Sequence, residues 1–512
     1  MKLEPVVSKL QPQLFDENSR WFRVFLIVMF LLAALIRRDE IGAPGFAPTR
    51  EYTSAIIARA FYYVGNDNIV PWRQNIAAML KDQQPILEPP LTEYLVSLSY
   101  RILGNEEISY ARYFTGIFWL IGGIFMYKLT KTLLSADAAL FATAYYLFVP
   151  MGVIVSRSFQ PEALMMMMYL ISLYYIIVYF ETRTKKHLCL ATFLTGVTLF
   201  VRPLVIFALF AAFIAIAIHR KGSARRVVDS SFMIFFAISM LIPFIYYGYG
   251  ILIADYMRWK VADSFRPHLF VHWEYWKGWL DSGIDVAGHL GIIIALLGFL
   301  FLRKSLARTL VISLAIGYFI FGLVFNYHIM THSYYHIQIF PLIGICASAF
   351  LVPIASTLAN VWDRYSWVIV GFVLLFGLDF SYKEVRWSLY RHVFEPPNVA
   401  KEIGEIIKHN PHVVTVAHEY GLPLAYYGEF SGTWWPEMIE EPLYRHPNAK
   451  EFSVRGRLDL LGFQPEYFVI TNFGLFNRFH QDLKAYLEEN CAVLAQTDSY
   501  WIFTSCEPAK TE

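Results

Sequence analysis

The feature that most limits how this chain can fold is a series of eleven apolar runs separated by polar segments. A helix needs about 20 apolar residues to cross a bilayer core, and several runs are shorter, so some helices must be tilted, broken or re-entrant. With 56% hydrophobic and only 16% charged residues, the composition is typical of a polytopic membrane protein with a soluble part. The runs cover residues 21–36, 112–127, 138–155, 163–180, 188–201, 203–218, 230–250, 287–302, 309–325, 337–355 and 366–380. We therefore predict an all-α polytopic membrane bundle of about eleven transmembrane helices.

The loop charges predict how these helices are oriented. If the amino terminus is cytoplasmic, the short inner loops hold most of the nearby basic residues, namely Lys128, Lys131, Arg183, Lys185, Lys186, Arg220, Lys221, Arg225, Arg226, Arg303, Lys304 and Arg308. The short outer loops hold only Arg157 and Arg202. This asymmetry follows the positive-inside rule. No small-x-small cleavage pattern follows the first run, which indicates a retained signal anchor in the plasma (inner) membrane.

The charges also divide one long apolar stretch, residues 188–218. Both of its ends carry basic clusters that this topology places in the cytoplasm, so we predict a hairpin that turns near Arg202 and Pro203. Arg202 is then at the outer face. An odd number of spans places the carboxyl-terminal segment outside as well.

Three parts of the chain follow from this topology: a cytoplasmic segment at 1–20, the transmembrane domain at 21–380, and an extracytoplasmic domain at 381–512. The first outer loop, 39–110, belongs to the transmembrane domain. It contains short amphipathic stretches at 53–63 and 91–103, which we expect to lie along the membrane interface.

The last part has the pattern of a small α/β domain. Helical periodicity is found at residues 398–409 and 477–489, and strand-like runs at 413–417, at 467–471, and around Val493 and Ile502.

Two of the four cysteines lie in this outer domain. If Asp498 and Ser499 form the turn of a two-residue hairpin, Cys491 lies directly opposite Cys506. A disulfide can form there in an oxidising compartment. The alternative is a pair of reduced thiols in a small core, since direct cross-strand bridges are often strained.

A pair of carboxylates, Asp39 and Glu40, follows the first apolar run. A carboxylate at the end of a span is partly desolvated, which raises its proton affinity and suits a general base for an incoming hydroxyl or amine. The alternative is an interfacial charge cluster, in which Arg37, Arg38 and the two acids pair and end the helix.

Arginines are predicted on the same outer side of the membrane. Those near the membrane plane are Arg50, Arg59, Arg73, Arg157 and Arg202. Guanidinium groups at that height can hold the phosphate of a lipid-linked donor and stabilise it as it leaves. The alternative for Arg157 is an ordinary pair with Glu162 that caps two helices.

Histidine and tyrosine are concentrated in the outer loop at 326–336, which contains three of each. They suggest contacts to a head group or sugar, although an aromatic belt accounts for the tyrosines alone. A metal site would need His328, His332 and His336 on one helical face, so no metal site is predicted, and a need for a divalent cation stays open.

Five stretches together resemble a known superfamily. They are EPPLTEYLVSLSYRILG at residues 88–104, ARYF at the start of the second span, SRSFQPEALMMMM at 156–168, FVRPL at 200–204 and HSYYHIQIFPLIG at 332–344. This pattern is similar to that of the dolichyl-phosphate-mannose protein mannosyltransferases, and more narrowly to their bacterial branch. That branch includes the aminoarabinose transferase of lipid A and related lipopolysaccharide sugar transferases.

The resemblance implies a GT-C fold and an inverting transfer of sugar from a polyprenyl phosphate. The catalytic acid of the superfamily follows the first span, where this chain has Asp39 and Glu40. The loop here departs from the usual pattern after that acid, so Glu51 is a third candidate base.

The resemblance also implies the donor-binding residues. A second acidic position corresponds to Glu162, and donor contacts fall to Arg157, Arg202, His332, Tyr334 and Tyr335.

These observations together predict an inverting glycosyltransferase. Its acceptor would be a cell-envelope glycolipid, a polysaccharide or a protein, and no nucleic-acid footprint is present. A secondary transporter is disfavoured, because the spans carry few ionisable residues and show no internal repeat. The remaining alternative is a non-catalytic membrane scaffold or lipid-binding protein of envelope assembly.

Overall fold

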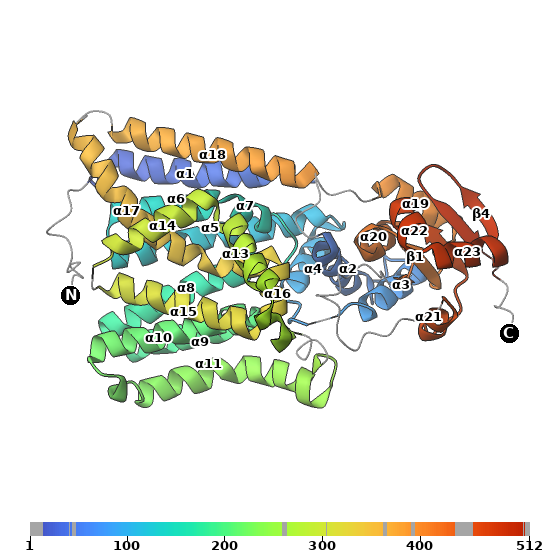
Figure 1. Cartoon of the computed structure of the whole chain (residues 1–512), viewed down its shortest axis with the longest axis horizontal. Helices are drawn as coiled ribbons and strands as arrows, with labels where there is room; N and C mark the ends of the chain where they lie inside the picture. Colours follow the sequence, from blue (N-terminus) through green and yellow to red (C-terminus); the bar gives the residue numbers. More distant parts are fainter. Residues whose placement is uncertain are drawn as a thin grey trace. The chain divides into compact units, whose positions relative to one another are not determined.

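A computed structural model describes residues 14–39, 41–42, 48–85, 87–258, 264–303, 305–361, 366–390, 395–435, 454–504 and 506 (Figure 1). The chain forms two compact units. The first contains Met1–Ala43, Leu87–Pro89 and Arg112–Ser388, and the second contains Pro44–Ile86, Pro90–Ala111 and Leu389–Glu512.

The first unit is a bundle of helices. Its elements are α1 (Arg20–Arg38), α5 (Ile108–Leu133), α6 (Ala136–Phe148), α7 (Pro150–Val155), α8 (Glu162–Thr182), α9 (Lys185–Val201), η1 (Pro203–Val205), α10 (Ile206–Lys221), η2 (Ala224–Arg226), α11 (Ser230–Gly248), η3 (Tyr249–Ile253), η4 (Pro267–Val271), α13 (Trp273–Ala287), α14 (His289–Phe301), α15 (Leu306–Val324), α16 (Asn326–Thr331), η5 (Ser333–Ile339), α17 (Phe340–Val361) and α18 (Ser366–Tyr390). Each of the eleven predicted apolar runs lies on one or two of these helices.

Fewer than eleven helices are long and apolar enough to cross a membrane unaided. Among the described residues five helical segments meet that test, and a sixth is added if α13 and α14, which are bent by 92°, count as one span. The count of eleven therefore stays a prediction. Breaks shorten several helices: Pro150 separates α6 from α7, and Pro203 separates α9 from α10.

Close helix packing holds the bundle together. Helix α8 packs against α9, α10 against α15, and α14 against α17. Glycine permits two of these contacts, because a Cβ at Gly317 would collide with the Ala208 backbone and one at Gly298 with the Cys346 carbonyl. Small residues at such crossings are the usual means of packing helices in membranes.

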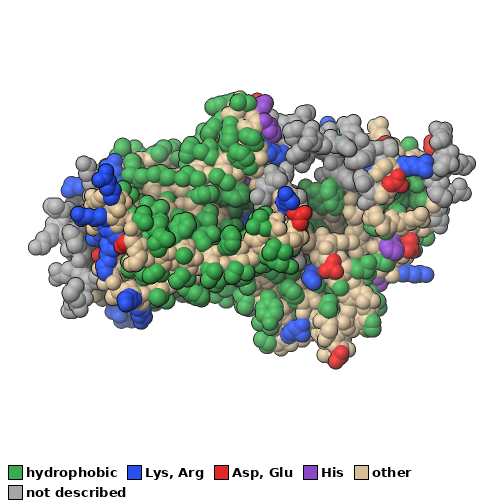
Figure 2. Space-filling view, turned by 90° about the horizontal axis from the view of Figure 1, so that it is seen from below, with side chains coloured by type: hydrophobic (Ala, Val, Ile, Leu, Met, Phe, Trp, Pro, Cys, Tyr) green, Lys and Arg blue, Asp and Glu red, His purple; other side chains and the backbone are tan. Residues whose placement is uncertain are grey.

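The outside of the bundle is apolar, and its basic residues gather at one end (Figure 2). Large apolar side chains are exposed on α11 and α14, such as Phe244 at 65% and Leu300 at 75%. An exposed apolar surface of this extent is expected where lipid surrounds a protein. We refer to the end that carries Arg183, Lys185 and Arg220 as the basic end.

The predicted hairpin at Arg202 is confirmed. At the basic end, Arg220 of α10 forms an ion pair with Glu181 of α8, and Thr309 bonds His219 at 3.0 Å. At the opposite end, Arg202 after α9 pairs with Glu162 at the start of α8. Helices α9 and α10 must therefore run in opposite directions.

The second unit contains a five-stranded sheet in the order β2-β1-β3-β5-β4. The strands are β1 (Val413–Val416), β2 (Gly432–Trp434), β3 (Tyr467–Ile470), β4 (Ala492–Gln496) and β5 (Trp501–Thr504), and the helices around them are α19 (Pro397–Ile406), η6 (His418–Gly421), α20 (Leu422–Gly428), α21 (Val454–Leu460), α22 (Phe473–Phe479) and α23 (Gln481–Asn490). Strand β1 pairs in parallel with β2 and β3, whereas β5 is antiparallel to both β3 and β4. The predicted α/β pattern is confirmed, although β2 and α20 were not foreseen.

Most of the first outer loop folds with this sheet, and not with the bundle as the domain prediction had it. Its helices are α2 (Pro48–Tyr63), α3 (Pro71–Asp82) and α4 (Leu91–Leu103). Helix α2 is buried on nearly every side, so it lacks the exposed apolar face expected of 53–63, and its position along the membrane interface stays a prediction. Arg59 and Tyr52 of this helix contact Tyr426 and Tyr427 of the carboxyl-terminal segment, which amphipathicity alone cannot reveal.

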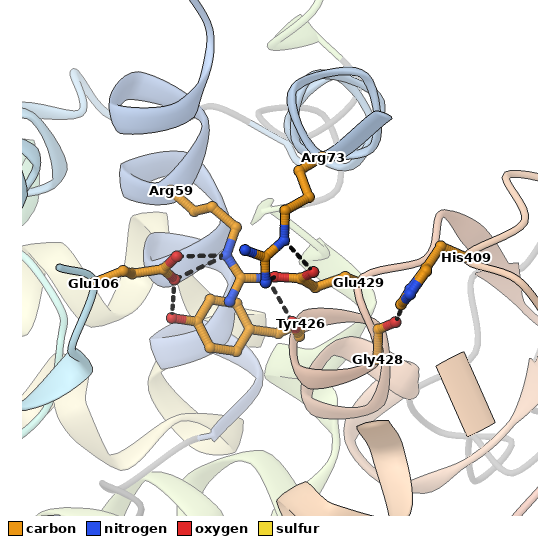
Figure 3. Close-up of polar contacts among 7 residues, drawn as sticks. All are labelled: Arg59, Arg73, Glu106, His409, Tyr426, Gly428 and Glu429. Carbon is orange, nitrogen blue, oxygen red and sulfur yellow. Dashed lines mark hydrogen bonds and ion pairs between the residues drawn. The ribbon is translucent and has the colours of Figure 1, made fainter. Parts of the chain in front are cut away.

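A polar cluster joins the loop helices to α20 (Figure 3). Arg59 of α2 bonds Glu106 at 2.8 Å and the Tyr426 carbonyl at 2.5 Å, and the Tyr426 hydroxyl donates to Glu106. Beside it, Arg73 forms two bonds of 2.6 Å with Glu429. Burial alone would lower the pKa of Arg59, but the charge of Glu106 reverses this and the pKa is raised. Burial and the charge of Glu106 also raise the pKa of Tyr426, which therefore keeps its proton as a donor.

Tyr426→Phe is expected to loosen the contact between α2 and α20 without unfolding the protein. The buried Glu106 carboxylate loses one donor, which costs about 1–2 kcal/mol. Amide hydrogen exchange in α2 should therefore become roughly tenfold faster, whereas the control Tyr486→Phe in α23 should leave it unchanged. Equal exchange in both variants would contradict this role for Tyr426.

A disulfide joins Cys491 to Cys506. The predicted register holds beside the turn, where Gln496 pairs with Trp501, but it shifts by one residue between Val493 and Ala495. With this bulge Cys491 is no longer directly opposite Cys506 as predicted, yet the two residues are bonded.

Cys491→Ser is expected to destabilise the second unit by about 3 kcal/mol, because the disulfide closes a loop of 15 residues. Thermal unfolding of the full-length protein in detergent, with Cys189→Ser as the control, measures this loss. An unchanged melting temperature with Cys491→Ser would show that the bond does not form in the membrane-inserted protein.

Candidate active site

A short buried segment with unusual polarity links α7 to α8. Ser156, Arg157, Ser158 and Gln160 are almost fully buried, and Glu162 at the start of α8 has no exposed surface. Charged groups buried in a membrane bundle are expensive and usually functional. This segment is therefore the starting point for locating a site.

Arg37 holds one end of the segment. Its Nε donates to the Ser156 hydroxyl at 2.7 Å, and its Nη2 donates to the Leu147 carbonyl at 3.0 Å. The same arginine thereby fixes the end of α1 against the break between α6 and α7. In the alternative interpretation Arg37 belongs to an interfacial charge cluster, but it is 4% exposed and contacts Ser156 and Leu147 inside the protein.

Asp39 follows two residues later, at the carboxyl end of α1. Its side chain is half-buried, and within the described part of the chain its carboxylate has no hydrogen-bond or ion-pair partner. The chain after it is held by Arg112 of α5, which donates to the Ile41 carbonyl at 2.6 Å. Asp39 thus lies near the segment that Arg37 anchors, and the Asp39 carboxylate bonds no other described group. Glu40 lies outside the described residues.

Arg202 holds the other end of the segment. It forms an ion pair with Glu162, and its Nε lies 3.4 Å from Glu88 Oε1. The Arg202 and Glu162 side chains are buried, and that of Glu88 is 17% exposed. Glu88 belongs to Leu87–Pro89, the part of the first loop that clusters with the bundle. Two carboxylates from distant parts of the sequence therefore orient one guanidinium.

Two tyrosines complete the surroundings of Arg202. Its guanidinium carbon lies 5.3 Å from the ring centres of both Tyr334 and Tyr335 in η5. His332 is half-buried at the break between α16 and η5 and bonds Thr331 at 2.7 Å. The structure thus brings Glu162, Arg202, Tyr334 and Tyr335 together.

The other two histidines of this loop have separate partners. His336 is buried, with Nδ1 2.6 Å from the Tyr318 hydroxyl and Nε2 2.6 Å from the Ile329 carbonyl. His328 lies 3.1 Å from the Ser264 hydroxyl. No group of three His, Cys, Asp or Glu side chains suited to a metal occurs among the described residues.

Sequence reasoning did not propose two residues of this cluster as site residues. Glu88 was noted only as part of the EPPL stretch, yet the two prolines that follow it are a signal for an extended, fixed backbone. Arg37 was considered only as part of an interfacial charge cluster. Glu51, the third candidate base, is fully buried in α2 of the second unit, and its role stays a prediction.

The bundle carries a buried arginine–carboxylate cluster at the end opposite its basic end, and the first outer loop folds with an α/β unit. Together these features define a fold of the GT-C glycosyltransferase type. Residues 87–247 match the family model described as dolichyl-phosphate-mannose-protein mannosyltransferase. This match and the structural likenesses below confirm the resemblance to that superfamily. No curated protein sequence matches the chain.

Two solved structures show the same fold. ArnT from Cupriavidus metallidurans bound to undecaprenyl phosphate is 13% identical, with a TM-score of 0.57 over 95% of this chain and 98% of that chain. The archaeal oligosaccharyltransferase AglB from Archaeoglobus fulgidus, in complex with an inhibitory peptide and a dolichol-phosphate, is 12% identical. Its TM-score is 0.51 over 88% of this chain and 70% of that chain.

Proposed function

We propose that this protein is an inverting glycosyltransferase that moves a sugar from a polyprenyl-phosphate donor to an acceptor outside the cytoplasm. The observation that carries the proposal is the buried cluster of Arg202, Glu162 and Glu88. Replacing such a cluster by apolar residues would often be neutral or stabilising, so its presence needs a reason other than stability. Binding of a charged lipid head group supplies that reason.

The charges of the site suit a phosphate. Arg37, Arg157 and Arg202 are buried in the bundle, and the Arg202 guanidinium is held by Glu88 and Glu162. Guanidinium groups held in a fixed plane suit the recognition of a phosphate. Glu162 and Glu88 would fix the plane of the Arg202 guanidinium, so that its remaining N–H groups hold the phosphate as charge develops on it.

Asp39 is the best-placed base. Glu162 and Glu88 already share Arg202, whereas the Asp39 carboxylate is uncommitted among the described residues. Asp39 would take the proton of the acceptor hydroxyl or amine as that group attacks the anomeric carbon, and the polyprenyl phosphate would leave from the opposite face. A single displacement of this kind inverts the anomeric configuration.

The loop charges indicate how the bundle is oriented. The basic end carries the Lys and Arg excess that marks the cytoplasmic side, so the site would face outward. His332, a predicted donor contact, is half-buried beside Tyr334 and would reach the donor head group or sugar.

Transfer of radiolabelled sugar from a panel of polyprenyl-phosphate sugars, in membranes that contain the protein, tests this function. Donor-dependent labelling is expected with wild type and with Arg225→Ala, which removes an exposed arginine at the basic end. If no donor of the panel gives labelling above membranes lacking the protein, the transferase proposal fails and a lipid-binding scaffold becomes the better explanation.

A further inference from the structure

In the sheet of the second unit, the order in which strands are added reverses beside the first strand, β1. The chain leaves β1, adds β2 on one side, and then crosses to add β3 on the other side, with all three strands parallel. In open α/β sheets, ligands bind where the strand order reverses, beyond the carboxyl ends of the strands. Here those ends are followed by His418–Gly421 after β1 and by Thr471 and Asn472 after β3.

A buried carboxylate lies at this switch point. Glu395 Oε1 accepts the His418 N–H at 3.2 Å and also accepts the Thr471 hydroxyl, which places the group between the loops that follow β1 and β3. Glu395 is only 6% exposed, and its Oε2 has no hydrogen-bond partner in the described part of the chain. A buried carboxylate oxygen without a donor is costly, so a ligand that brings a donor would satisfy it.

The loop after β1 is held in an unusual conformation. Glu419 and Tyr420 have φ of 52° and 58°, followed by Gly421 at 71°. Residues other than glycine rarely adopt this left-handed region, and such strain persists where surrounding contacts enforce it, as at ligand clamps. One enforcing contact is visible, because Glu419 accepts the Thr49 hydroxyl at 2.5 Å and the Thr49 amide at 3.2 Å.

Polar and aromatic side chains surround the carboxylate. Asn472 Nδ2 lies 3.3 Å from His418 Nδ1, so an amide and an imidazole bridge the two loops. The strained loop brings the Tyr420 ring to 4.9 Å from that of Trp434, the last residue of β2. Both rings keep exposed surface, 43% for Tyr420 and 36% for Trp434.

We propose that this edge of the sheet is a carbohydrate-binding site. Glu395 and Glu419 repel anions and accept hydrogen bonds, so the ligand must be uncharged or cationic and rich in donors, as the hydroxyl groups of a sugar are. Exposed tyrosine and tryptophan rings offer flat apolar faces to the C–H groups of a pyranose ring. The site deepens the proposed function: if the protein is a transferase, a glycan acceptor is the class of molecule that this site holds.

Saturation-transfer NMR tests the site. It measures whether maltotetraose, chitotetraose or mannotetraose binds to the full-length protein in detergent. At least one of them is expected to bind. Trp434→Ala and the isosteric Glu395→Gln should each weaken that binding at least tenfold. Trp273→Ala, which removes an exposed tryptophan of α13, should not change it.

The proposal is overturned if none of the three sugars binds, or if both Trp434→Ala and Glu395→Gln bind as wild type does. Competition by inorganic phosphate would also overturn it, because it would show an anion site. The variant Arg202→Ala distinguishes the carbohydrate-site proposal from the transferase proposal. If Arg202→Ala loses transfer and still binds the sugar, both assignments are supported. If the wild-type protein binds the sugar but transfers none, the carbohydrate site is supported and the transferase proposal fails.

Discussion

Arg202→Ala is expected to lower kcat/KM for sugar transfer by roughly 100- to 1,000-fold, equivalent to about 3–4 kcal/mol of transition-state stabilisation. The guanidinium is buried, fixed by Glu162 and Glu88, and lies over the rings of Tyr334 and Tyr335. The measurement is the steady-state rate of transfer with each donor that wild type accepts.

A simple loss of folding could imitate that result. Removing Arg202 leaves the Glu162 carboxylate buried without its partner, which costs about 3–5 kcal/mol. The double variant Arg202→Met with Glu162→Gln removes both charges, so it should recover stability but not transfer. Wild-type transfer by this double variant would remove Arg202 from the mechanism.

Asp39→Asn is expected to reduce kcat by roughly 10²- to 10⁴-fold with little change in donor binding, since the amide cannot accept the acceptor's proton. The substitution preserves the size of the side chain. Because the Asp39 carboxylate bonds nothing among the described residues, the fold should tolerate the change. Single-turnover rates at saturating donor measure the effect.

Two matched substitutions decide between the candidate bases. Glu40→Gln should retain transfer if Asp39 is the base. Glu51→Gln alters a fully buried residue of α2, so its effect should appear in the melting temperature and not selectively in kcat. A selective loss of kcat in Glu40→Gln or Glu51→Gln, with Asp39→Asn active, would transfer the role to that residue.

Much of the bundle could be predicted because hydropathy depends on local sequence. Apolar runs gave the helices, and basic clusters gave the hairpin at Arg202 that the ion pairs Arg220–Glu181 and Arg202–Glu162 confirm. The bends were not predictable in the same way. The 92° bend between α13 and α14 lies at Gly288, which has a φ of 79°, and hydropathy does not record such a turn.

The environment of the outer loop was harder to foresee. Helix α2 contains Thr53, Ser54 and Arg59, and such polarity favours a surface position. Its partners are Glu93 and Glu106 in the same loop and Tyr426, which is more than three hundred residues away, and their contacts offset the cost of burying these polar groups. Strand β2 was missed because its three residues, which include Gly432, carry no alternating pattern.

Most residues of the candidate site could be predicted from the sequence, but the contacts that bring them together could not. Glu162, Arg202, Tyr334 and Tyr335 were all named from residue type and position, and the structure brings them together. Arg37 and Glu88 were not proposed as site residues, because a charged residue beside an apolar run is as often at the surface as inside. Their burial depends on contacts with Ser156 and Arg202, more than one hundred residues away in sequence.

The joint folding of the first outer loop with the carboxyl-terminal sheet has a consequence during synthesis. Helices α2 and α3 leave the ribosome early, but Tyr426 and Glu429, which bond Arg59 and Arg73, are translated hundreds of residues later. The loop helices must therefore wait for these partners until most of the chain has been synthesised. Premature termination anywhere before β1 would leave Arg73 without Glu429 and Arg59 without its contact to Tyr426, and a truncated chain would be a substrate for quality-control proteases.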